Sequence, residues 1–476
     1  MSMILRSLPA APHFVVSTRL RLWFLPIICS RGVKLLRRSS TTPLLGILNT
    51  MKIRDDQLKN VITPEMKTLE ELFVKNGFEI RIAGGAVRDL LMGSIPQDFD
   101  FATTATPDEM KKMFTDEGIR MLNLGGEKHG TITARINDKE NFEVTALRID
   151  MVTDGRRAEV EYTTDWHTDA NRRDLTVNAM YLSFDGTVYD YFKGIEHLKE
   201  RKVRFVGNPG YRIQEDYLRI LRYFRFYGRL ALNENSHDAD ILEAIRLNAN
   251  GLSNVSGERL LVEFRKILEG KLYCSLVCLM HELGVTSYLG LPESLDVAEF
   301  RRVCQLSDKL APIAMTRLAA LIRTEDEALQ LHSRLRLSNF DKNHLLFLVH
   351  YREKTPKGAD TEDLHFFQEL QFTCNIKGAS KAEIHRWTQE LLKYHGNETL
   401  LQKFNAWEIP RFPVKGTKLL DLGLKKGPEL GRTLQHLRKI WFESGFELNE
   451  EQLLSKVKDI FKEASPEHSS KLQEVP

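Results

Sequence analysis

The stretch that decides the fold of this 476-residue chain is IAGGAVRDLLMGSIPQDFDFATTATP, which runs from Ile82 to Pro107. An apolar run typical of a strand leads into the pair Gly84 and Gly85, and a short helical segment follows. The pattern DFDF then indicates a second strand. Because successive side chains of a strand point to opposite faces, we expect Asp98 and Asp100 to project to the same side.

Asp98 and Asp100 are candidate metal ligands. Two neighbouring carboxylates repel each other and are difficult to keep ionised without a cation. Glycine lacks a Cβ atom, so Gly84 and Gly85 let the backbone approach phosphate groups closely. Beside such a loop the natural cation is Mg²⁺, which binds oxygen ligands together with substrate phosphates. This combination predicts two-metal phosphoryl or nucleotidyl transfer, although an isolated Asp-x-Asp pair is commonly a solvated edge or turn.

The composition favours a soluble globular protein of several domains. Charged residues make up 28% of the chain, mean hydropathy is −0.32 and the formal net charge is +3. This charge is not the strongly basic balance that by itself indicates nucleic-acid binding. An RNA site would therefore rely on local basic patches.

The first 50 residues differ from the rest because they contain no Asp or Glu. Their basic residues are Arg6, Arg19, Arg21, Arg31, Lys34, Arg37 and Arg38. Without these seven, 61 basic residues face 65 acidic ones, a formal net charge of −4. An acid-free leader rich in Arg and Ser resembles a mitochondrial transit peptide, and a secretory signal is the runner-up. A second start at Met51 would yield a cytosolic or nuclear form, and no stretch has the roughly 20 apolar residues of a membrane span.

The cysteine pattern argues against a disulfide framework, because the number is odd and the spacing sparse. The cysteines are Cys29, Cys274, Cys278, Cys304 and Cys374. No histidine ligand set accompanies them, which argues against zinc, and we interpret them as reduced residues.

The elements change character along the chain. From about Leu58 to Val206 short β-type runs alternate with helical ones, which predicts a mixed α/β domain. Beyond Arg212 apolar residues recur at helical spacing, which predicts an all-α remainder. The fold class is therefore α+β.

The motif IQEDYLRILRYFRFYG, residues 213–228, supplies a candidate face for reading a base. On one helix, Asp216, Arg219 and Arg222 are spaced by three and share a face. A carboxylate accepts a hydrogen bond from an exocyclic amino group, and a guanidinium donates to an acceptor beside it. Such a pair accepts cytosine and adenine but rejects uracil and guanine without a template. A surface ion pair within the helix is the alternative interpretation.

Together these motifs resemble the nucleotidyltransferase signature of the polymerase beta superfamily. More narrowly, residues from about 60 to 460 resemble the class II tRNA nucleotidyltransferases, or CCA-adding enzymes, and their bacterial poly(A) polymerase relatives. The resemblance implies a polymerase-beta-like head with a mixed sheet, followed by a helical neck, body and tail. It also implies addition of C, C and A to the tRNA 3′ end from CTP and ATP, with Mg²⁺ and release of pyrophosphate.

The resemblance assigns roles to particular residues. Asp98, Asp100 and Glu143 match the catalytic metal ligands, although periodicity alone does not choose between Glu143 and Asp150 as the third carboxylate. The positions that match nucleotide-binding residues are Gly84, Gly85, Arg88, Arg173, Asp174, Asn178, Asp216, Arg219, Arg222 and Arg225. The positions that match a mobile loop involved in switching from C to A addition are Asp154, Gly155, Arg156 and Arg157.

Three further motifs complete the match. DYFKG, residues 190–194, has Lys193 where the family usually has a glycine. SGERLLVEFRKIL, residues 256–268, is interpreted as a structural helix of the neck. In GLKKGPELG, Lys425 and Lys426 adjoin a helix N-terminus where backbone N–H groups can hold RNA phosphates, and solvated lysines are the alternative.

The resulting domain assignment is a transit peptide at 1–50, a head at 51–206, a neck at 207–270, a body at 271–395 and a tRNA-binding tail at 396–476. The alternatives are a poly(A) polymerase, a partial enzyme that adds only A or only CC, and an RNA-binding protein with an inactive head. A homodimer is compatible with the sequence.

Overall fold

The computed structural model describes residues 48–122, 130–153, 158–356, 363–374, 376 and 378–464. Most of the predicted transit peptide, Cys29, and the predicted mobile loop at 154–157 lie outside these ranges. Within them, no helix combines the length and apolar character needed to span a membrane. The four cysteines that the structure describes are free thiols, as predicted.

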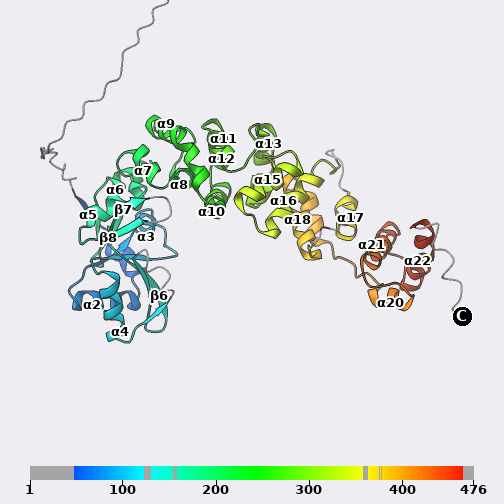
Figure 1. Ribbon diagram of the computed structural model, residues 1–476, viewed down its shortest axis with the longest axis horizontal. Helices are drawn as coiled ribbons and strands as arrows, with labels where there is room; N and C mark the ends of the chain where they lie inside the picture. Colours follow the sequence, from blue (N-terminus) through cyan, green and yellow to red (C-terminus); the bar gives the residue numbers. More distant parts are fainter. Residues whose placement is uncertain are drawn as a thin grey trace, which may run out of the picture. The chain divides into compact units, whose positions relative to one another are not determined.

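The described head contains an eight-stranded sheet of order β1-β10-β9-β2-β3-β6-β5-β4 and a two-stranded sheet, β7-β8 (Figure 1). The strands are β1 (Asn49–Lys52), β2 (Ile80–Ala83), β3 (Asp100–Thr103), β4 (Arg120–Leu122), β5 (Thr131–Ile136), β6 (Glu140–Ala146), β7 (Arg148–Thr153), β8 (Ala158–Tyr162), β9 (Met180–Leu182) and β10 (Thr187–Asp190). Strands β3 and β6 run parallel. Strand β1 pairs with β10 from Asn49 onward, so the head sheet begins two residues before the predicted boundary at Met51.

Alternating side chains place the sheet between two apolar layers. Ile82 and Phe101 join the main core with α2 and α4, whereas Ala83 and Ala102 face Trp166 of α5 on the other side. The helical segments of the head are α1 (Asp55–Lys59), α2 (Pro64–Lys75), α3 (Gly85–Leu91), α4 (Pro107–Asp116), α5 (Trp166–Asn171), η2 (Thr176–Asn178) and α6 (Gly194–Lys199).

All described elements after α6 are helical, which confirms the predicted α+β class (Figure 1). They are α7 (Pro209–Glu215), α8 (Arg219–Leu230), α9 (Ala239–Asn248), η3 (Ala249–Asn254), α10 (Gly257–Leu268), α11 (Tyr273–Glu282), α12 (Val285–Tyr288), α13 (Val297–Ser307), η4 (Asp308–Leu310), α14 (Ala314–Ala319), α15 (Glu325–Leu335), α16 (Asn339–Tyr351), α17 (His365–Thr373), α18 (Lys381–Tyr394), α19 (Glu398–Ala406), α20 (Gly416–Asp421), α21 (Pro428–Glu443) and α22 (Glu450–Ala464). Leu400 and Phe404 of α19 join the main core. A second core around Trp441 and Phe442 joins α20, α21 and α22 and also includes Phe372 of α17.

Asp216 was expected on the same helix as Arg219 and Arg222, and that prediction is wrong. Helix α7 ends at Glu215 and α8 begins at Arg219. Between them Asp216 has an extended backbone, with φ −153° and ψ 105°. Its Oδ1 accepts the Leu218 N–H at 3.1 Å, a local bond that competes with helix continuation.

Lys193, the position where the resemblance leads one to expect a glycine, adopts a backbone conformation that favours glycine. It precedes α6 with φ 62° and ψ 28°, in the left-handed region. Gly194 cannot carry a side chain here, because a Cβ would lie 2.4 Å from the Thr176 carbonyl oxygen. The tight approach of α6 to η2 therefore survives the Lys193 substitution.

Candidate active site

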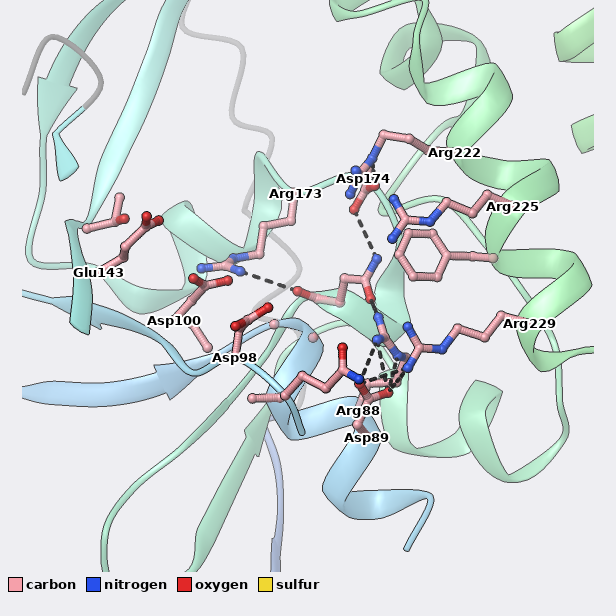
Figure 2. A pocket seen from close by; sticks show the side chains of 18 of the residues that line it. Arg88, Asp89, Asp98, Asp100, Glu143, Arg173, Asp174, Arg222, Arg225 and Arg229 are labelled. Carbon is pink, nitrogen blue, oxygen red and sulfur yellow. Dashed lines mark hydrogen bonds and ion pairs between the residues drawn. The ribbon is translucent and has the colours of Figure 1, made fainter. Parts of the chain in front are cut away.

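One open cavity of about 1110 Å³ lies between the head and the neck (Figure 2). Its head wall comes from β2, α3, β3, β6 and the segment around η2, and its neck wall from α8, α10 and the α7–α8 junction. All predicted catalytic and nucleotide-binding residues line this cavity. The structure therefore brings together side chains that lie more than 130 positions apart in the sequence.

Gly84 shapes the floor of the cavity. It has φ 66° and ψ −115°, a conformation that residues with a Cβ rarely adopt, and it precedes α3. A Cβ at this position would meet Arg173 Nη1 at 3.1 Å and the Asn178 carbonyl oxygen at 3.4 Å. The glycine thus allows Arg173 to lie against the turn that leads into α3.

Three carboxylates line the cavity beside this turn, because Asp100 is the strand partner of Ala83, the residue before Gly84 (Figure 2). Asp100 begins β3 and pairs with Glu143 of the parallel strand β6, whereas Asp98 lies just before the strand. Of the two alternatives for the third carboxylate, Glu143 therefore adjoins Asp100, and Asp150 belongs to β7. Surrounding protein raises the pKa of Asp100 mainly by desolvation, and the charges of Glu143 and Asp98 add to the increase.

These carboxylates fit a divalent cation in the chemistry of their donors, because mutual repulsion falls when a cation binds. Among the described residues, however, no group of three or more His, Cys, Asp and Glu side chains is already gathered into a metal site. The assignment of Asp98, Asp100 and Glu143 as ligands thus remains a prediction.

Arg173 is held in the cavity by a buried acid that the sequence analysis did not select. Its Nη2 lies 3.3 Å from Asp169 Oδ2, and its Nη1 donates to the Asn178 carbonyl oxygen at 3.4 Å. The hydroxyl of Tyr181 also donates to Asp169 Oδ2, at 2.5 Å. Burial raises the pKa of Asp169, but Arg173 and Arg172 lower it more, so the net pKa falls.

A hydrogen-bonded row runs from Arg222 through the head (Figure 2). Arg222 Nε donates to Asp174 Oδ2 at 2.6 Å, and Asn178 Nδ2 lies 3.5 Å from Asp174 Oδ1. Asn178 Oδ1 accepts from Arg88 Nη1 at 2.5 Å. Arg88 also forms a fork with Asp89, at 3.0 and 3.1 Å. Only 3% of Arg88 is exposed, so its guanidinium contacts mainly the protein groups around it.

The predicted base-reading pair comes from the junction between α7 and α8. Asp216 and Arg219 share a backbone hydrogen bond, and their side chains bind other partners. Asp216 Oδ2 accepts from Arg259 Nη2 of α10 at 2.7 Å. Arg219 Nη1 binds Glu215 and the Arg212 carbonyl oxygen, and its Nη2 donates to the Arg172 carbonyl oxygen at 3.0 Å. Hydrogen bonds to other residues of the protein therefore hold both side chains in place at the cavity. The two residues do not share a helix face as predicted, because Asp216 lies outside α8.

Several cationic residues of the cavity were not predicted. They are Arg148, Arg172, Arg229, Arg259 and Lys266. Arg259 and Lys266 belong to the SGERLLVEFRKIL segment, which was interpreted as structural. Helix α10 therefore both lines the cavity and supports the neck, because Glu263 of the same helix binds Arg225 Nη1 of α8 at 3.1 and 3.2 Å.

Lys425 and Lys426 lie far from the cavity in sequence and belong to the exposed turn before α21. Gly427 precedes that helix with φ 142°. The placement agrees with the predicted helix N-terminus, and RNA binding by these lysines stays a prediction.

The comparisons with known proteins agree with the class of enzyme that the fold and cavity define, a nucleotidyltransferase. Residues 80–204 match the poly A polymerase head domain, and residues 238–294 match the probable RNA and SrmB-binding site of polymerase A. The structure resembles the Bacillus stearothermophilus CCA-adding enzyme in complex with CTP, with a TM-score of 0.66, 22% identity and coverage of 85% of this chain and 99% of that chain. At that identity the likeness supports the fold.

Sequence relatives narrow the assignment. Over 408 residues the chain is 52% identical to the mitochondrial CCA tRNA nucleotidyltransferase 1 of Danio rerio, covering 86% of this chain and 94% of the relative. It is 50% identical over 412 residues to the Homo sapiens protein of the same name, with the same coverage. The chain belongs to the CCA tRNA nucleotidyltransferase family.

Proposed function

We propose that this protein adds C, C and A to the 3′ end of tRNA without a nucleic-acid template, using CTP and ATP and releasing pyrophosphate. The observation that carries the proposal is the shared cavity. It joins three carboxylates suited to phosphoryl chemistry with an acid and an arginine suited to reading a base. Family membership supplies the tRNA substrate.

The head performs the transfer. The terminal 3′-hydroxyl of the tRNA attacks the α-phosphorus of the nucleotide, the new phosphodiester forms and pyrophosphate leaves. Asp98, Asp100 and Glu143 would hold Mg²⁺, which lowers the pKa of the attacking hydroxyl and neutralises the leaving pyrophosphate when bound. Gly84 opens the backbone toward the triphosphate, and Arg173 supplies a fixed positive charge beside it.

The neck selects the nucleotide. The Asp216 carboxylate accepts from the exocyclic amino group that cytosine and adenine share, and Arg219 donates to the neighbouring acceptor. Uracil and guanine place a carbonyl oxygen where the amino group would be, so two acceptors face each other. An unpaired buried polar group costs ~1–3 kcal/mol, which corresponds to roughly a ten- to hundredfold preference.

The body and tail hold the tRNA through its shape and phosphates. Lys425 and Lys426 are exposed at a helix N-terminus, where both side-chain charge and backbone N–H groups suit phosphate. We assign these lysines to the tRNA interface.

The proposal is tested by incubating the purified protein with a tRNA that lacks CCA and with each nucleotide alone or in combination. Sequencing of the 3′ ends should show complete CCA only when CTP and ATP are both present. Incorporation of A alone would favour a poly(A) polymerase or an A-only enzyme, and incorporation of CC alone a CC-adding enzyme. No incorporation would favour an RNA-binding protein with an inactive head.

For localisation we propose the mitochondrion, because the leader is basic and acid-free and the named relatives are mitochondrial proteins. Initiation at Met51 would add a cytosolic or nuclear form. A fluorescent reporter fused to residues 1–50 should enter mitochondria, and its exclusion would contradict the transit peptide.

A further inference from the structure

Helix α8 contacts the head along its length, beginning with the bond from Arg219 Nη2 to the Arg172 carbonyl oxygen at 3.0 Å. Near its beginning Arg222 binds Asp174 through the 2.6 Å bond described above. Near its end Arg229 Nη2 donates to both oxygens of Asp89, at 3.0 and 2.9 Å, across 140 positions of sequence (Figure 2). Because a helix rises 1.5 Å per residue, the Arg229 contact lies about 15 Å along the helix from Arg219.

Asp89, which accepts the Arg229 hydrogen bonds, belongs to α3, the helix that follows the Gly84 turn proposed to bind phosphate. Asp89 is the residue after Arg88 in α3, and its two oxygens also receive the Arg88 fork. Phe226 of α8 adds a second contact at this end, because the Arg88 guanidinium lies 4.9 Å from the centre of its ring. Arg229 and Phe226 therefore hold two consecutive residues of α3.

We propose that Arg229 is a positioning residue that governs nucleotide selection from a distance, through Asp89. Arg219 and Arg222 hold the beginning of α8 on the head, and Arg229 with Phe226 holds its end, so contacts at both ends together fix the orientation of the helix. The helix begins at Arg219, so its orientation sets where the base-reading pair stands relative to the phosphate-binding turn at Gly84. This inference rests on the proposed function, since it concerns the choice among nucleotides.

The test compares kcat and KM for CTP and for UTP on a tRNA lacking CCA, in Arg229→Ala, Asp89→Asn and the double variant. Misplacement of reacting groups by about 1 Å can cost up to about a hundredfold in rate. We expect a loss of roughly tenfold or more in the preference for CTP, with a raised KM for CTP. The double variant should be no worse than the worse single variant, because both remove one contact.

Arg265→Ala is the matched control, because Arg265 Nη2 binds Asp341 Oδ2 at 2.9 Å in an ion pair of similar exposure that joins α10 to α16. It should lower the melting temperature about as much and leave the CTP preference unchanged. Wild-type preference in Arg229→Ala would overturn the proposal. So would a loss in Arg229→Ala that Asp89→Asn does not share, since Arg229 would then contact the substrate directly.

A second variant and a wild-type measurement complete the experiment. If Arg229→Ala fails to fold, Arg229→Lys replaces it, because lysine keeps the charge and one donor, and an intermediate loss of preference is expected. Full wild-type preference in Arg229→Lys would then contradict the proposal. Failure of the wild-type protein to incorporate CTP would instead refute the proposed function, and the two failures are thereby distinguished.

Discussion

At the residue scale, the turn before α6 shows how one position departs from its family while the next cannot. Lys193 adopts a left-handed backbone conformation, which costs a residue with a Cβ about 1–2 kcal/mol. Gly194 lies so close to the Thr176 carbonyl that any side chain would collide with backbone. Lys193 therefore adopts a backbone conformation that favours glycine, whereas Gly194 is required by its close packing.

Substitutions at these two positions should act in opposite directions. Lys193→Gly removes the backbone strain but adds freedom to the unfolded chain, so the free energy of unfolding should stay constant or rise by up to about 1 kcal/mol. Gly194→Ala should lower it by about 1–3 kcal/mol, because α6 must move away from η2. Urea denaturation measures both, and a neutral Gly194→Ala would contradict the packing described.

At the element scale, helix α16 (Asn339–Tyr351) carries a histidine that makes the body sensitive to acid. His344 is fully buried and its ring stacks on Trp387, with centroids 6.1 Å apart. Within the described residues neither ring nitrogen has a hydrogen-bond partner. Burial, aided by the charge of Lys393, lowers the pKa of His344 to about 3.

This lowered pKa predicts a loss of stability in acid. The unfolded chain binds a proton near pH 6.5 and the folded chain only near pH 3, so His344 destabilises the fold as pH falls from 6.5 toward 3. At pH 5 the loss is about 2 kcal/mol. His344→Phe should reduce the fall in free energy of unfolding between pH 7 and 5, measured by denaturant titration. An unchanged pH dependence of the free energy of unfolding in His344→Phe would contradict the lowered pKa of His344. His237, whose pKa burial also lowers, to about 4, should leave a residual dependence.

Some helices and strands could be predicted from the sequence, and others could not. Neighbouring residues were enough to predict β2, the glycine turn and a strand at DFDF, although β3 begins at Asp100 and Asp98, which was expected on the strand, lies just before it. The break at Asp216 escaped prediction because the helical spacing of apolar residues continues through it, while its carboxylate binds Leu218 N–H and Arg259. Arg229 was missed for a different reason, since only the folded chain places it beside Asp89.

At the scale of the whole molecule, we propose that the head performs the transfer, the neck selects the nucleotide and the tail binds tRNA. Substituting Lys425 and Lys426 together by Glu should weaken tRNA binding and lower its salt dependence, because each lost phosphate contact reduces the salt slope by about 0.7–0.9. The KM for CTP should stay unchanged. Filter binding over a salt series measures the effect, and Lys456→Glu, an exposed lysine of α22, is the control. Equal effects of the two substitutions would contradict a specific contact.

We propose that the head transfers any nucleotide that the neck admits. Asp216→Asn tests it most directly, because the amide oxygen can still accept the Leu218 N–H, while the amide N–H₂ replaces the oxygen that accepts from Arg259, cannot accept from a cytosine amino group and can donate to a uracil carbonyl oxygen. The measurement is kcat/KM for CTP and for UTP on a tRNA lacking CCA, beside Asp100→Asn. We predict that Asp216→Asn retains transfer but shifts preference toward UTP by tenfold or more, whereas Asp100→Asn loses transfer of both nucleotides. Unchanged preference in Asp216→Asn, or full transfer in Asp100→Asn, would contradict the account.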